Sequence, residues 1–293
     1  MKFSINHRTT FSYSQPVSIS HHVLHLTPRA LPYQFCERSG VIIDPAPSVR
    51  SESLDYFGNP VTHLTVQVPH PKLEVHANAQ VDVTTPVLPE LDQSPAWEEV
   101  RRQVEEAEDF ERRDAYQFTF DSPYILGNEE TFELGKECFP PGRPFLSGVM
   151  ELTTRIFQDF TYEGGVTDVS TPIKEILKTR KGVCQDFAHL QIACLRSLGL
   201  PARYVSGYLL THPPEGKEKL VGSDASHAWL STWCPGIGWV DFDPTNNLIP
   251  RGEHITLAWG RDYGDVSPIN GFMIGGGEHT LAVAVDVAPL DGN

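Results

Sequence analysis

The N-terminal part of the chain alternates apolar and polar residues with the two-residue period of a β-strand. Residues 3–7 and 17–20 alternate in this way, and residues 41–43 and 63–68 are rich in β-branched side chains. Clusters of proline, glycine and asparagine that are typical of turns separate these segments. Short strands with frequent turns and no helical period predict a β-sandwich-like N-terminal domain over residues 1–85.

A proline-rich connection and an acidic helix are expected next, over residues 86–121. The prolines at its start each remove a backbone hydrogen-bond donor, which disfavours a central strand and favours a domain boundary. Ser94 as N-cap and Pro95 at the first helical position predict a helix that runs to about residue 113. The region holds 11 acidic and 4 basic residues, a pattern typical of a solvated helix face.

The remainder of the chain mixes helices and strands. Apolar residues at helical spacing predict helices over residues 148–160 and 184–198, the second ending at Gly199, and Thr171 and Pro172 begin a shorter helix. Strands are predicted over residues 203–209, 225–233, 239–243 and 280–287, with a polar loop over residues 211–224. We therefore expect an α+β fold in which residues 122–293 form a helix-on-sheet core with a C-terminal strand.

Charge and cysteine content narrow the range of partners and compartments. The chain has 293 residues, and 38 acidic against 23 basic side chains give a net charge of −15, which disfavours nucleic acid and anionic membranes as partners. No stretch approaches the ~20 apolar residues of a membrane span, so we expect a cytoplasmic protein unless an export signal has been removed. Five cysteines without a CxxC pair argue against a disulfide framework.

Cys184 is the candidate nucleophile. It falls in the first turn of the predicted helix, where unpaired backbone amides and the positive end of the helix dipole stabilise a thiolate. Three cations lie just upstream, and the amide of Cys184 would point at an oxyanion forming on an attacked carbonyl. The other four cysteines are interpreted as small hydrophobic residues; they are Cys36, Cys138, Cys194 and Cys234.

A thiol nucleophile needs a general base, and two histidines compete for this role. His189 is close in sequence, but five residues turn a helix by about 140°, so His189 faces away from Cys184. His227 lies on a predicted strand that turns back into the strand over residues 239–243. We therefore favour His227, brought to Cys184 by the fold.

The hairpin also predicts a carboxylate partner for His227. If Trp233 pairs with Trp239, Trp229 lies opposite Asp243, and His227 is the diagonal neighbour of Asp243 at roughly 7–8 Å. A carboxylate there would orient the imidazole as in a nucleophile–base–acid triad. Asp241 has the same parity and stays an alternative, whereas Asp186 is expected to cap the helix that Cys184 begins.

Four motifs bear a family resemblance. Residues 182–188, 195–208 and 238–246, together with His227-Ala228-Trp229, resemble the bacterial transglutaminase-like superfamily. The resemblance implies a papain-like arrangement of a helix on a sheet, with Cys184 as nucleophile, His227 as base and Asp243, rather than Asp241, as acid.

The resemblance extends beyond this core. Residues 11–13, 24–29 and 55–59 are similar to the β-rich N-terminal region of bacterial members, and residues 260–268 resemble the segment that follows the core. The calcium-binding acidic clusters of animal transglutaminases have no counterpart. Tyr162 is a candidate for the side-chain half of the oxyanion hole, although a core position is favoured for this aromatic residue.

Together these features predict a thiol-dependent amide-bond hydrolase, a cysteine peptidase or amidase that acts on a peptide or protein amide through a thioester acyl-enzyme. Acyl transfer from glutamine to lysine is the alternative reaction, and a non-catalytic binding module is the alternative outside enzymes. We expect no cofactor and no metal. The histidines at positions 21, 22 and 25 are interpreted as part of a surface strand, and the glycines at positions 275–277 as a flexible turn.

Overall fold

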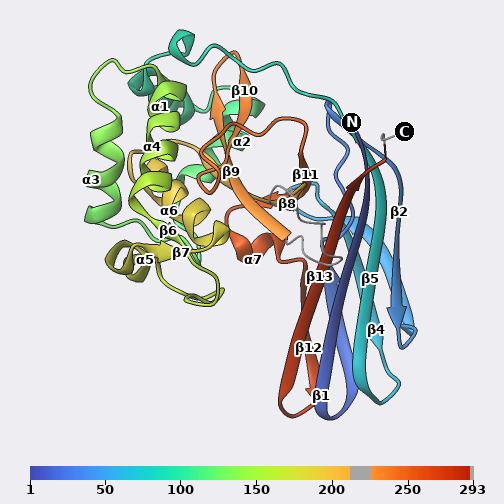
Figure 1. Ribbon diagram of the computed structural model, residues 1–293. Coiled ribbons are helices and arrows are strands. Elements are labelled where there is room, and N and C mark those ends of the chain that lie inside the picture. The colour runs from blue at the N-terminus through green and yellow to red at the C-terminus, as the bar shows by residue number, and fades with distance from the viewer. Residues whose placement is uncertain (212–225, 291–293) are drawn as a thin grey trace, which may run out of the picture.

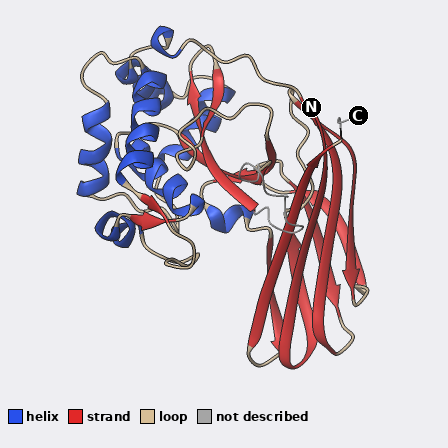
Figure 2. Cartoon of the chain, in the orientation of Figure 1, coloured by secondary structure: helices blue, strands red, loops and turns tan. Residues whose placement is uncertain are grey.

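The computed structural model describes residues 1–211 and 226–290, so the polar loop predicted at residues 211–224 lies almost wholly outside the described residues. A sheet of long strands stands beside a body of helices that surround a smaller sheet (Figure 1). Figure 2 shows how the helices gather in this second body, away from the long strands. Within the described ranges, none of the helices is both long and apolar enough to cross a bilayer.

The long sheet is built around β1, a single strand of 23 residues where the sequence predicts two shorter ones. The N-terminal half of β1 pairs with β5 and β13, and its C-terminal half pairs with β4 and β12. The sheet has seven strands, namely β1 (Lys2–Leu24), β2 (Gln34–Asp44), β3 (Val49–Leu54), β4 (Pro60–Val66), β5 (His70–Val83), β12 (Ile269–Gly275) and β13 (His279–Pro289).

This sheet curls so that its two halves enclose a common core, which is the sandwich-like feature predicted from the alternating pattern. Alternate residues of β5 are buried along most of its length, as the two-residue period requires. Leu24 and Leu64 from one half pack in the same cluster as Val41 and Val75 from the other. The predicted β-rich N-terminal region is therefore present.

The last two strands join the N-terminal sheet, whereas the sequence assigned residues 122–293 to a single core. β13 runs antiparallel to β1 from the Phe3–Pro289 pair to the Tyr13–His279 pair. Val285 and Val287 share a buried cluster with Phe3 and with the helices of the second body. Strand periodicity predicts that residues 280–287 form a strand, but it carries no information about which strand they pair with.

The helical body differs from the sequence prediction chiefly at its start. The helix expected from Ser94 begins at Trp97 and is interrupted at Ala107, whose φ of 47° is left-handed. Ser94 does not cap it, because its hydroxyl donates to the Leu91 carbonyl. The helices are α1 (Trp97–Glu106), α2 (Phe110–Tyr116), α3 (Glu129–Cys138), α4 (Phe145–Asp159), α5 (Ile173–Thr179), α6 (Cys184–Ser197) and α7 (Tyr263–Val266).

The smaller sheet and α6 form the centre of this body. Its antiparallel strands follow the order β10 (Gly238–Phe242), β9 (Ser226–Cys234), β8 (Ala202–Leu209) and β11 (His254–Gly260). Trp239 pairs with Trp233, which is the register that the sequence predicts for this hairpin. α6 packs against β8 and β9 and is buried along nearly all of its length, polar residues included.

Candidate active site

Cys184 is the first residue of α6, as its place in the sequence pattern predicts. A carboxylate organises this helix start, because Asp186 Oδ2 accepts the Val183 N–H at 2.8 Å and the Thr167 hydroxyl at 2.7 Å. The capping role expected for Asp186 is therefore confirmed. Gly182 is required here, since a Cβ at this position would approach the Asp186 carboxylate to 2.8 Å. Cys184 is partly exposed at the end of an otherwise buried helix.

The fold brings His227 between Cys184 and Asp243. His227 Nε2 donates to Asp243 Oδ2 at 2.8 Å, and the imidazole also hydrogen-bonds the Cys184 thiol. Burial by itself lowers the pKa of His227, but the hydrogen bonds to Asp243 and Cys184 outweigh burial and raise this pKa to about 10. The imidazole is therefore held as an imidazolium at neutral pH, which is the form that stabilises a neighbouring thiolate.

Asp243 is a fully buried carboxylate surrounded by donors. Its Oδ1 accepts the backbone N–H groups of Thr245 and Asn246, and its Oδ2 accepts the Asn246 side-chain amide at 2.7 Å and two imidazole N–H groups. Burial raises the pKa of Asp243, but the hydrogen bonds from the imidazoles outweigh it and hold the pKa well below its usual range. The carboxylate therefore stays ionised beside His227.

The second imidazole belongs to His254, a residue that sequence reasoning missed. His254 begins β11 and is 5% exposed, and its Nε2 lies 2.9 Å from Asp243 Oδ2. The β-branched and aromatic residues after His254 predict a strand, so the sequence could have shown that His254 begins one. The pattern does not reveal that β11 lies beside β8, which is what brings His254 to Asp243.

His227, Asp243 and His254 are also the residues best placed to hold a metal among those that the structure describes. One ligand atom from each lies within 4.8 Å of the others, and imidazole and carboxylate suit several transition metals. The same atoms are already joined by hydrogen bonds of 2.8 and 2.9 Å, so an ion would displace the contacts that support His227.

The alternative acid, Asp241, and the alternative base, His189, have other hydrogen-bond partners. Asp241 Oδ2 accepts the Trp229 indole N–H at 3.1 Å, so of the two aspartates Asp243 is the one that contacts His227. His189 is buried, and its Nε2 accepts the Tyr263 N–H at 3.2 Å. Burial, with a smaller contribution from Arg196, lowers the pKa of His189 to about 3. His189 is thus bonded to Tyr263, whereas the imidazole bonded to Cys184 is that of His227.

Tyr162 is not the core residue that the sequence favours. It ends the short strand β6 (Thr161–Tyr162), its side chain is 57% exposed, and its ring contacts Phe187. Burial of the hydroxyl region and the negative charge of Cys184 both raise the pKa of Tyr162. Tyr162 therefore lies near the start of α6, within range of electrostatic interaction with Cys184.

The four other cysteines are in apolar surroundings. Cys138, Cys194 and Cys234 are buried and Cys36 is partly buried. Burial raises the pKa of each, to about 12 for Cys234. Their thiols are therefore held protonated at neutral pH.

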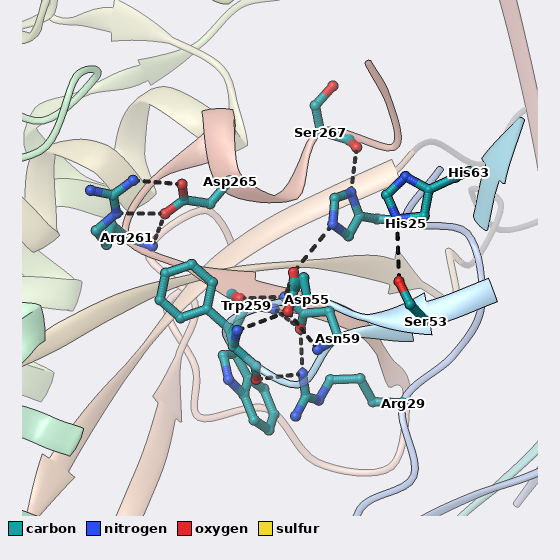
Figure 3. Close-up of polar contacts among 11 residues, drawn as sticks. His25, Arg29, Ser53, Asp55, Asn59, His63, Trp259, Arg261, Asp265 and Ser267 are labelled. Carbon is teal, nitrogen blue, oxygen red and sulfur yellow. Dashed lines mark hydrogen bonds and ion pairs between the residues drawn. The ribbon is translucent and has the colours of Figure 1, made fainter. Parts of the chain in front are cut away.

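The histidines at positions 21, 22 and 25 do not form a surface strand. His22 and His25 are buried. His25 hydrogen-bonds Asp55 and the Ser267 carbonyl, because the curled sheet folds this end of β1 against the second body (Figure 3). The glycines at positions 275–277 form the β12–β13 turn, with φ of 94°, 89° and 61°.

Comparison with known proteins explains this combination of a long sheet and a helical core. Residues 3–82 match the family model of the bacterial transglutaminase-like N-terminal region, and residues 139–244 match that of the transglutaminase-like superfamily. The chain belongs to the transglutaminase-like superfamily. The resemblance inferred from the sequence motifs is therefore confirmed.

Two curated relatives match all or nearly all of the chain, and a third matches part of it. An uncharacterized protein of Mycobacterium tuberculosis is 39% identical over 300 residues, covering 100% of this chain and 94% of that protein. An uncharacterized protein of Mycobacterium leprae is 31% identical and covers 99% of both chains. A protein-glutamine gamma-glutamyltransferase of Pseudomonas aeruginosa is 34% identical over 100 residues, which are 32% of this chain and 15% of that protein.

Among solved structures, a Cytophaga hutchinsonii protein named as a candidate cysteine protease superimposes with a TM-score of 0.77. The match covers 100% of this chain and 92% of that one at 24% identity. At this identity the similarity establishes the fold, which is the expected α+β arrangement of a β-rich N-terminal region and a transglutaminase-like core.

Proposed function

We propose that this transglutaminase-like protein is a thiol-dependent amide-bond hydrolase, a cysteine peptidase or amidase. The observation that carries the proposal is the chain of contacts from the Cys184 thiol through His227 to the ionised carboxylate of Asp243. A helix-start cysteine beside an imidazolium that a buried carboxylate supports is the arrangement of an activated thiol nucleophile. The fold shared with the Cytophaga hutchinsonii protein agrees with this activity class.

In the proposed reaction the Cys184 thiolate attacks the carbonyl carbon of an amide, and the carbonyl electrons move to its oxygen. The Cys184 backbone N–H lies in the first turn of α6, where amides have no intrahelical partner and can donate to this oxyanion. The imidazolium of His227 gives its proton to the leaving amine and a thioester remains. Water, which gives a proton to the now neutral His227, then attacks the thioester carbonyl; the carbon–sulfur bond breaks, the acid leaves, and the Cys184 thiolate and the imidazolium are restored.

The direct test of the nucleophile is selective alkylation. Iodoacetamide at mildly acidic pH should modify Cys184 before the other cysteines, because burial raises the pKa of each of the other four thiols. Peptide mass spectrometry identifies the modified residue, and Cys184→Ala should abolish both labelling and hydrolysis of an amide-containing peptide library. Preferential labelling of another cysteine would overturn the assignment.

Acyl transfer between glutamine and lysine is the second candidate, favoured by the similarity of 100 residues to the Pseudomonas aeruginosa protein-glutamine gamma-glutamyltransferase. Transfer requires an amine to reach the thioester before water does. We rank hydrolysis first, because buried packing accounts for Trp229 and Trp233, which could otherwise line an amine channel. Adding a millimolar primary amine to the peptide reaction separates the two: predominantly free acids support hydrolysis, and predominantly amine adducts reverse the ranking.

A further inference from the structure

The hydrogen bond from His254 to Asp243 gives the proposed triad a fourth member. Asp243 Oδ2 accepts from His227 on one side and from His254 on the other, at 2.8 and 2.9 Å. The N–H groups of Thr245 and Asn246 and the Asn246 side-chain amide hold this carboxylate from its own turn. His254 adds a donor from β11 to the donor from β9, so the position of Oδ2 relative to His227 also depends on where β11 lies.

The two ring nitrogens of His254 have different surroundings. Its Nδ1 is buried and has no hydrogen-bond partner within the described part of the chain. Nε2 faces a carboxylate oxygen, which can only accept, so Nε2 carries a hydrogen and donates it to Asp243. Among the residues that the structure describes, the single polar contact of this buried ring is therefore with the carboxylate that supports His227.

β11 carries His254, and it is the edge strand of its sheet, paired with β8 on one side only. Its other edge is bonded by two side-chain amides of the N-terminal region and by the Arg29 backbone N–H, which donates to the Thr256 carbonyl at 3.2 Å. Gln34 accepts the Thr256 N–H and donates to the Thr256 carbonyl, both at 2.8 Å. Asn59 accepts the Trp259 N–H at 2.9 Å and donates to the Trp259 carbonyl at 2.8 Å. Each amide thus pairs with one residue of β11 as a neighbouring strand would.

The two amides are themselves held firmly. Gln34 and Asn59 are 1% and 0% exposed. The Asn59 side chain donates to Asp55 at 2.7 Å and accepts from Arg29, whose guanidinium lies over the Trp259 ring (Figure 3). Arg29, Asp55 and Asn59 come from two of the motifs by which the N-terminal region resembles its family, and no step of the proposed reaction uses them.

From these contacts we infer that His254 is a positioning residue for the triad, and that the N-terminal region holds it in place by clamping the free edge of β11 through Gln34 and Asn59. The inference rests on the proposed function for the role of Asp243. It assigns the N-terminal sheet a part in the active site: Thr256 lies two residues beyond His254 on the same strand, so a shift of β11 would move the imidazole away from Asp243.

The first test compares two substitutions of His254 in the full-length protein. His254→Leu removes the donor, whereas His254→Gln keeps an N–H that can reach the carboxylate. The readouts are the rate of Cys184 alkylation by iodoacetamide as a function of pH, and kcat and KM for peptide hydrolysis. Loss of a hydrogen bond to a charged group predicts a fall in kcat of about tenfold to a hundredfold for His254→Leu, with KM nearly unchanged.

The pH profile separates positioning from a general loss of structure. Without the His254 donor the Asp243 carboxylate binds a proton more readily and supports the His227 imidazolium less well. The pH at which the alkylation rate of Cys184 falls on acidification should therefore be higher in His254→Leu than in the wild-type protein, and should return to the wild-type value in His254→Gln. His70→Leu, which removes a buried histidine of the N-terminal sheet, is the matched control and should leave the profile in place. An unmoved profile in a folded His254→Leu protein, or equal damage by Leu and Gln, would overturn the inference.

The second test is a double-mutant cycle with Gln34→Met, which keeps the side-chain length and removes both Gln34 hydrogen bonds to Thr256 while leaving the bond from the Arg29 N–H. If Gln34 acts through His254, Gln34→Met should slow alkylation about threefold to tenfold alone and less than about twofold in the His254→Leu background. Equal losses in both backgrounds would overturn the clamp. Thermal unfolding shows whether each variant is folded. If Gln34→Met is unfolded, Gln34→Glu replaces it, because a carboxylate keeps the acceptor for the Thr256 N–H.

The positioning role of His254 can be tested independently of the proposed hydrolysis. Alkylation reports on Cys184, His227 and Asp243 without any substrate. A profile that shifts in His254→Leu while the wild-type protein hydrolyses no peptide would support the positioning role and contradict the hydrolase.

Discussion

At the scale of single residues, the environment of Asp243 decides which chemistry the site can perform. Two backbone N–H groups, one amide and two imidazoles donate to a carboxylate that is fully buried. A carboxylate so supplied with donors does not take the proton of His227, but it orients the ring and stabilises its charge. Asp241, two residues earlier, has a different partner in the Trp229 indole and provides a natural comparison.

Asp243→Asn should therefore reduce activity far more than Asp241→Asn. The first substitution removes the charge that supports the imidazolium, and we expect a loss in kcat/KM of about a thousandfold or more, the size of loss that follows when the acid of a catalytic triad is replaced. The second leaves an amide oxygen that can still accept the Trp229 N–H, and the loss should stay below about tenfold. Steady-state kinetics with one peptide substrate compares the two, and a larger loss for Asp241→Asn would contradict the assignment.

Chelation should leave activity unchanged. The ligand atoms of His227, Asp243 and His254 are engaged with one another, and the proposed thiolate mechanism requires no Lewis acid. Hydrolysis and Cys184 alkylation should continue at wild-type rates in excess EDTA. Loss of activity that calcium or zinc restores would instead point to a metal-dependent protein.

At the scale of elements, the close contact between β8 and β11 is what places His254 beside Asp243. Gly207 of β8 lies against this contact, because a Cβ there would overlap the Ile255 carbonyl oxygen and come within 2.5 Å of the Trp229 ring. Only a residue without a side chain allows the two strands and the indole to approach so closely.

Gly207→Ala should accordingly lower the free energy of unfolding by about 1–3 kcal/mol or more and slow Cys184 alkylation. The extra methyl group must push β11 or Trp229 away, and both movements disturb the partners of Asp243. Gly164→Ala is the control, since a Cβ at that position meets nothing within 4 Å. Chemical denaturation measures the free energy of unfolding of both variants. A Gly207→Ala protein as stable as Gly164→Ala would contradict the close packing of β8 against β11.

At the scale of the whole molecule, the two bodies share one core. Phe3, Ile5 and Val285 of the long sheet belong to the same buried cluster as Phe139 and Leu190 of the helices. Buried histidines lie in both bodies: burial lowers the pKa of His7 and His22 to about 4 and that of His189 to about 3.

These histidines predict that stability falls on acidification. In the unfolded chain each takes up a proton near pH 6.5, whereas the folded protein keeps them neutral until about pH 4, so the unfolded state binds more protons between these values. The free energy of unfolding should decrease there by about 1.4 kcal/mol per pH unit for each group. The raised pKa of His227 acts in a different range, since its contribution is complete below pH 6.5 and is lost as the pH rises towards 10.

Thermal unfolding between pH 4 and pH 7 tests this prediction. The slope of the melting temperature against pH should become shallower in His22→Leu and should be unchanged in His63→Leu, which replaces an exposed histidine of the same sheet. A melting temperature that does not change over this range would show that the buried histidines accept protons without loss of the fold.

The sequence alone determined those features whose contacts are local along the chain. The helical period located α6 to within a residue or two and put Cys184 in its first turn, because helix caps and dipoles depend on neighbouring residues. The tight turn before Trp239 defined the register that brings His227 near Asp243, because two-residue periodicity and a short connection leave few alternatives. The family motifs are drawn from these same local segments.

Tertiary structure decided what depends on the partner of each element. An alternating strand pattern fits any open sheet edge, so it could not reveal that β13 pairs with β1 or that β11 lies between β8 and the amides of Gln34 and Asn59. The approach of α6 to β9, which unites Cys184 with His227, likewise follows from the burial of apolar faces distant in sequence. Local hydrogen bonding encodes elements, whereas the choice among their possible neighbours is made by the free energy of packing the whole chain.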